Sequence, residues 1–61
     1  MKFEYWQSLT GGMYWYWHLK ADNGKVVADG GEGYVSEYGV KEAIERFKHK
    51  VADADVLPLK H

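Results

Sequence analysis

The segment at residues 13–20 constrains the fold most, because large apolar side chains recur there at every second position. Successive side chains of a β-strand point to opposite faces of a sheet. Trp15, Trp17 and Leu19 would therefore share one face, which is wholly apolar. The opposite face would carry Tyr14, Tyr16, His18 and Lys20. This alternation predicts a strand that packs its tryptophan face on a core.

Two shorter segments predict further strands on either side. Residues 2–7 place Phe3 and Tyr5 on one face of a strand. The other face of that strand would carry Lys2, Glu4 and Trp6. Residues 25–29 form the third candidate, and glycine-rich turns follow the first and third segments. The three segments together predict a three-stranded antiparallel meander.

The connection between the second and third strands leaves two registers open. An Asn-Gly pair between apolar runs is typical of a tight hairpin turn. A two-residue turn would place Val26 and Ala28 beside the core. A three-residue loop with Gly24 in the left-handed region would instead pair Val27 with Leu19. We favour the three-residue loop, and both registers stay open at the level of sequence.

An amphipathic helix is predicted after the meander. One apolar stripe recurs at helical spacing and consists of Val40, Ala43, Ile44, Phe47 and Val51. Gly39 can cap the helix, with Glu42 reaching back to the cap amide. Ser36 is the alternative cap if the helix begins one turn earlier.

The expected core combines the apolar strand faces with the helix stripe. Its members are Phe3, Tyr5, Trp15, Trp17, Leu19, Val27, Val40, Ala43, Ile44, Phe47 and Val51. A chain of 61 residues supports one domain, residues 1–61, and buries only about 60% of its unfolded surface. Cysteine is absent, so disulfides cannot strengthen this thin core. Oligomerisation is then the leading means of stabilisation.

The last apolar segment, residues 55–59, does not continue the helix stripe. It contains Val56, Leu57 and Leu59, and it follows a polar bridge. Pro58 restricts such a segment to the edge or the end of a strand. Pairing with the sheet edge of a second copy would bury these three side chains and satisfy the backbone.

Charge and composition argue against several functions. The net charge is −1 and no basic tract occurs, so we expect no binding of duplex nucleic acid. No apolar run approaches the roughly 18 residues of a membrane span, and a cytoplasmic location is the default expectation. His18, His49 and His61 lack a second ligand at metal spacing. We expect no metal and no cofactor.

The glycine-rich loop at residues 30–33 invites a comparison with phosphate-binding loops. Neither a lysine nor a serine or threonine follows it at the spacing of a P-loop. A simple chain reversal, in which Glu32 bonds nearby backbone amides, is the favoured interpretation.

The chain resembles the YegP-like family of small proteins of unknown function. The resemblance rests on Phe3-Glu4-Tyr5, on the run from Trp15 to Ala21, on Asn23-Gly24, on Gly31-Glu32-Gly33-Tyr34, and on the helix around Ala43 to Lys48. No single motif is specific, but their order and spacing together are. The match extends over nearly the whole chain.

The resemblance implies an α+β fold made of a β-β-β-α-β unit that works in pairs. For a single unit it implies a homodimer in which the C-terminal strands, residues 55–59, are exchanged. It supplies no established activity. Family members often carry basic residues where this chain has Tyr16 and His18, which weakens any idea of a basic sheet surface here. Gly39 also stands where a serine-type cap is usual.

Two functional hypotheses follow, and an enzyme is the third and weakest because no nucleophile–base pair is evident. The first is a non-enzymatic homodimeric interaction module with Val56, Leu57 and Leu59 at its interface. The second is a weak binder of single-stranded nucleic acid or carbohydrate, in which exposed aromatic rings stack on the ligand. Its candidate residues are Trp6, Tyr14, Tyr16 and His18.

Overall fold

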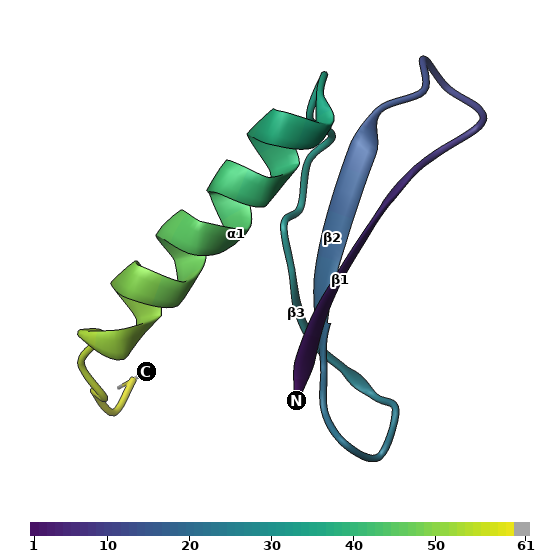
Figure 1. The fold of residues 1–61 in the computed structure, drawn as a ribbon. Helices are drawn as coiled ribbons and strands as arrows, with labels where there is room; N and C mark the ends of the chain where they lie inside the picture. Colours follow the sequence, from purple (N-terminus) through teal and green to yellow (C-terminus); the bar gives the residue numbers. More distant parts are fainter. Residues whose placement is uncertain (60–61) are drawn as a thin grey trace.

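A three-stranded antiparallel sheet followed by one helix makes up the fold. The computed structural model describes residues 1–59. The strands are β1 (Lys2–Gln7), β2 (Trp15–Lys20) and β3 (Val26–Asp29), in the order β1-β2-β3, and the helix is α1 (Glu37–Ala52) (Figure 1). The predicted α+β meander is confirmed. Residues 55–59 form no strand within this single chain, so the last element of the expected unit is not seen.

The core lies between α1 and one face of the sheet (Figure 1). The helix packs on β1 and β2, and among residues 1–59 it makes no comparable contact with β3. The buried residues are Trp17, Val40, Ala43 and Ile44, and all four were expected in the core. Phe3, Trp15, Leu19, Tyr34 and Phe47 are partly buried against them. Aromatic contacts hold the two layers together, since the Trp17 and Phe47 rings lie 5.0 Å apart.

Three expected core residues lie at the surface. Val51 is 50% exposed. A helix of 16 residues is about 24 Å long and a six-residue strand about 20 Å, so the last helical turn has less sheet to pack against. Val27 is 51% exposed, because a bulge in the β2–β3 hairpin moves it out of register. Tyr5 is the third of these residues, at 38% exposure.

The β2–β3 hairpin has the predicted loop but not the predicted pairing. Ala21 N donates to Lys25 O at 2.9 Å, and Gly24 has φ +87°, as expected for a three-residue loop. A β-bulge then shifts the register between Leu19 and Lys20. Leu19 therefore pairs with Ala28, and the extra residue in β3 is Val27. The prediction that Val27 pairs with Leu19 is wrong by this single residue.

The helix begins one turn earlier than the favoured cap predicted. Ser36 is the N-cap, and its Oγ accepts a hydrogen bond from Gly39 N at 3.0 Å. Gly39 is therefore inside the helix, and Glu42 is not at the third helical position. In the first turn, Tyr5 Oη donates to Glu37 Oε2 at 2.8 Å and ties β1 to α1. This hydrogen bond raises the pKa of Tyr5, because losing the proton would break it.

Candidate functional site

The outward face is the side of the sheet that points away from α1, and aromatic residues of β1 and β2 meet there. Trp6 is the cross-strand partner of Tyr16. Their ring centroids are 6.2 Å apart with an interplanar angle of 29°, a stacked arrangement. The ring of His18 lies 4.9 Å from that of Trp6. Trp6 is 43% exposed, so part of this stack is open to solvent.

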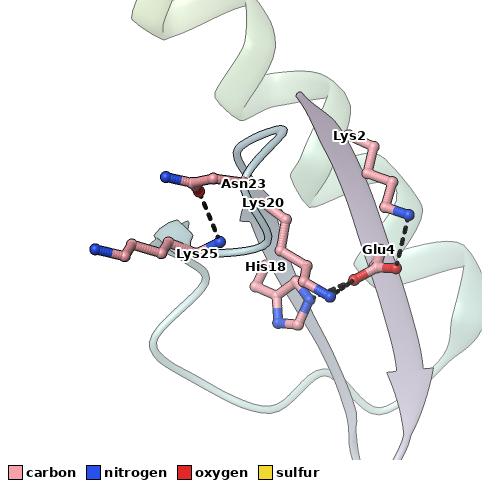
Figure 2. A network of polar contacts seen from close by, with 6 residues as sticks. All are labelled: Lys2, Glu4, His18, Lys20, Asn23 and Lys25. Atoms are coloured by element: carbon pink, nitrogen blue, oxygen red, sulfur yellow. Dashed lines mark hydrogen bonds and ion pairs between the residues drawn. The ribbon is translucent and has the colours of Figure 1, made fainter.

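A charged cluster continues the outward face toward the start of β1 (Figure 2). Glu4 is the cross-strand partner of His18, and His18 Nε2 lies 2.7 Å from Glu4 Oε1. Lys20 Nζ lies 3.5 Å from the same oxygen, and Lys2 Nζ lies 3.7 Å from Glu4 Oε2. One carboxylate therefore faces three groups that can carry positive charge.

These contacts hold the pKa of Glu4 below its usual range. The hydrogen bond from His18 is the largest cause, and the positive charges of Lys20 and Lys2 act in the same direction. Desolvation by neighbouring groups partly opposes the effect. Glu4 is therefore committed to contacts within the sheet, which leaves it little capacity to bind a ligand.

A shallow hollow opens beside the aromatic stack, and we call it the aromatic–acidic hollow. Its volume is about 380 Å³. The lining residues come from all three strands and the glycine-rich loop, and they are Trp6, Tyr16, Trp17, His18, Val26, Asp29, Gly31 and Glu32. Three of the four predicted ligand-binding residues, Trp6, Tyr16 and His18, are thus brought together.

The fourth predicted residue, Tyr14, lies apart from the lining of the hollow. It precedes β2 and packs against two glycines. A Cβ on Gly33 would lie 2.7 Å from Tyr14 Cβ and 3.2 Å from Tyr16 Oη, so the glycine-rich loop passes closely over both tyrosines. Glycine is needed at Gly33 because any side chain would collide with these rings.

Asp29, Glu32 and Val26 also line the hollow, and none of them was among the predicted ligand-binding residues. Strand parity could have placed Asp29 on the outward face, had the bulge been anticipated. The expectation for Glu32 was a hydrogen bond to nearby backbone amides. No ion pair within residues 1–59 involves Asp29 or Glu32, in contrast to Glu4.

The histidines do not form a shared site in the described part of the chain. His18 lies on β2, and His49 lies in the last turn of α1. His61 lies outside the described residues. Within residues 1–59, no three histidine or acidic side chains are grouped as they would be to hold a metal ion. No helix in that range is long and apolar enough to cross a membrane.

Comparison with known proteins defines the class to which this small meander-and-helix unit belongs. Residues 13–57 match the family described as "Domain of unknown function (DUF1508)". The chain belongs to this family, which the resemblance to YegP-like proteins had indicated.

One solved structure supports the same assignment. The chain is similar to a protein from Haloferax volcanii whose solution structure was determined by NMR. The two are 36% identical, the match covers 95% of this chain and 97% of the other, and the TM-score is 0.73. No curated protein matches the chain.

Proposed function

We propose that this protein is a non-enzymatic interaction module that works as a homodimer through its C-terminal segment. Residues 55–59 of each chain would add a strand to the sheet of the partner. The observation that carries the proposal is the exposure of Val56, Leu57 and Leu59 at 96%, 79% and 81%. Burying each such side chain would stabilise the protein by about 1.5–3 kcal/mol, a large gain for a domain with a thin core.

The β3 edge of the sheet is the surface that best fits the added strand. β1 and β3 are the two edges of the sheet, and α1 packs on β1 and β2. At the β3 edge, Val26 and Val27 are both about half exposed. A strand laid along β3 would pair with its free backbone groups and cover apolar side chains at the same time.

Sedimentation of the full chain at micromolar concentration tests this proposal. We expect a dimer, and we expect Leu57→Glu to shift it to a monomer. Leu57 is exposed in the single chain, so the substitution should leave the monomer fold intact. Val35→Glu is the matched control, since Val35 is 86% exposed but lies outside the segment. A full chain that sediments as a monomer, or a Leu57→Glu dimer as stable as the parent, would contradict the proposal.

A second function is favoured by the stacked, partly exposed rings of Trp6 and Tyr16. Exposed aromatic rings on a sheet can stack on nucleobases or sugars. We therefore propose that the outward face also binds a ligand through these rings. Stacking alone points to single-stranded nucleic acid or carbohydrate. This role does not need the dimer.

Tryptophan fluorescence tests ligand binding by the outward face. The chain is titrated with oligonucleotides and with oligosaccharides, and Tyr16→Ala should abolish any saturable change while keeping Trp6 as the reporter. Tyr38→Ala is the matched control, because Tyr38 is 75% exposed on the helix. A response that is the same in Tyr16→Ala and the parent would rule out this face.

A further inference from the structure

We propose that the aromatic–acidic hollow binds a small organic cation that carries a methylated ammonium group, with choline as the simplest example. This inference rests on the proposal that the outward face binds a ligand, and it names the class of that ligand. It follows from which charged and aromatic side chains the fold brings into one hollow.

The charge of the hollow is the first reason to expect a cation there. Asp29 and Glu32 line it and are exposed, and neither forms an ion pair within residues 1–59. The lysines of the outward face, Lys2 and Lys20, are drawn instead to Glu4, which is not part of the lining. No ion pair within residues 1–59 therefore neutralises either carboxylate, although Asp29 also borders a second hollow beside Arg46 and Lys50. Two carboxylates in the lining attract positive charge.

The aromatic side chains that line the hollow are the second reason to expect a cation there. Trp6 and Tyr16 both line the hollow, and the exposed face of an aromatic ring attracts a cation through its quadrupole, with tryptophan the strongest. A methylated ammonium group is weakly hydrated and apolar at its surface, so it also suits Val26 in the same lining. The carboxylates attract a cation electrostatically, and a neutral sugar lacks that attraction.

The same carboxylates argue against a nucleic acid in the hollow. A single strand places phosphates beside the bases that stack, and binding sites for it normally combine aromatic rings with a positively charged groove. Asp29 and Glu32 would repel those phosphates. The volume of about 380 Å³ lies in the range of small-molecule sites, which favours a free cation over a folded partner.

NMR titration of the intact chain with choline chloride tests the proposal. The indole N–H signal of Trp6 is the readout, and sodium chloride is varied in parallel to match ionic strength. We expect a saturable shift with choline. We expect about tenfold weaker binding of 3,3-dimethylbutan-1-ol, a neutral molecule of the same shape.

Substitutions test whether the carboxylates of Asp29 and Glu32 are responsible for choline binding. Asp29→Asn with Glu32→Gln removes the charge and keeps the shape, and we expect it to weaken choline binding by about tenfold. Glu45→Gln is the matched control, because this exposed helical carboxylate is paired with Lys48 and does not line the hollow. An unchanged Glu45→Gln titration beside a weakened double variant would support the proposal.

Other outcomes overturn it in distinguishable ways. Equal binding of choline and the neutral alcohol would mean that the hollow selects apolar shape and not charge. A shift with an oligonucleotide or oligosaccharide but not with choline would overturn the ligand class and keep the outward face as a binding surface. Binding of a trimethyllysine peptide but not of choline would replace the free cation with a peptide. No saturable shift with any probe would overturn two proposals: the binding of a methylated ammonium group in the hollow, and the binding of any ligand by the outward face.

Discussion

A small set of buried side chains holds the helix on the sheet. Ile44 is 8% exposed and belongs to the cluster around Trp17 and Val40. We predict that Ile44→Ala lowers the free energy of unfolding by about 2–5 kcal/mol, because it removes buried carbons and leaves a cavity. Urea unfolding at one fixed protein concentration measures the change.

Val51→Ala is the control for this prediction. Val51 lies on the same helix stripe but is 50% exposed, so the loss should be only about 0.5 kcal/mol. Equal losses at Ile44 and Val51 would show that the last turn of α1 is buried in solution, as it would be if a second chain covered it.

The turn at Gly24 depends on backbone conformation and not on space. Gly24 has φ +87°, and a Cβ placed there would meet no atom within 4 Å. We predict that Gly24→Val destabilises the protein by roughly 1–2 kcal/mol, because an L-residue is strained in the left-handed region. Thermal melting measures the loss. Gly24→Asn should cost clearly less, since asparagine tolerates this region, and equal losses would contradict the explanation.

Between elements, the Glu4 cluster makes the β1–β2 pairing sensitive to acid. The pKa of Glu4 is lowered in the folded chain from an ordinary value of 4.5. A carboxyl whose folded pKa is depressed contributes stability that is fully present above its unfolded pKa and is lost as the pH falls through the folded pKa. We therefore predict that Glu4→Gln destabilises the protein above pH 4.5, and that the difference from the parent shrinks at lower pH.

Melting temperatures of parent and Glu4→Gln across this pH range provide the measurement. Glu45→Gln is the control, because its partner Lys48 sits at the surface and such pairs contribute little. A difference between parent and Glu4→Gln that grows as the pH falls would have the wrong sign for this explanation.

The elements could be predicted from the sequence because their periodicity is strong. Alternation in β2 and the stripe of α1 identified Trp17, Val40 and Ile44 as core residues, and all three are buried. The details that failed depend on one-residue choices between similar local energies. A bulge moves Val27 out of register, and Ser36 caps the helix although Gly39 was also permissible.

The candidate site could be predicted only in part. Strand parity placed Trp6, Tyr16 and His18 on one face, and the structure brings them into one hollow. Asp29 and Glu32 enter that hollow because of the bulge in β3 and the path of the glycine-rich loop over Tyr14. Neither the bulge nor the path of the loop produces a periodic signal, so the favoured register did not place these two residues there.

At the level of the whole molecule, stability should depend on protein concentration. If residues 55–59 pair with a second chain, dilution shifts the equilibrium toward a monomer with a thin core. We predict that the melting temperature rises with concentration, and that a chain ending at Ala54 melts lower and without this dependence. Circular dichroism over a hundredfold dilution series measures both. A melting temperature that is the same at all concentrations would contradict the dimer.

The order of the sheet, in which every strand lies beside its neighbour in sequence, has a kinetic consequence. Each hairpin closes through a short loop, and chains dominated by such local contacts fold quickly, on the order of milliseconds or faster. Association of two chains is a bimolecular step whose rate falls with dilution. If residues 55–59 pair with a second chain as proposed, a refolding trace should therefore separate into a rapid phase whose rate does not depend on concentration and a later phase whose rate does, with the meander and helix of each chain formed before two chains associate.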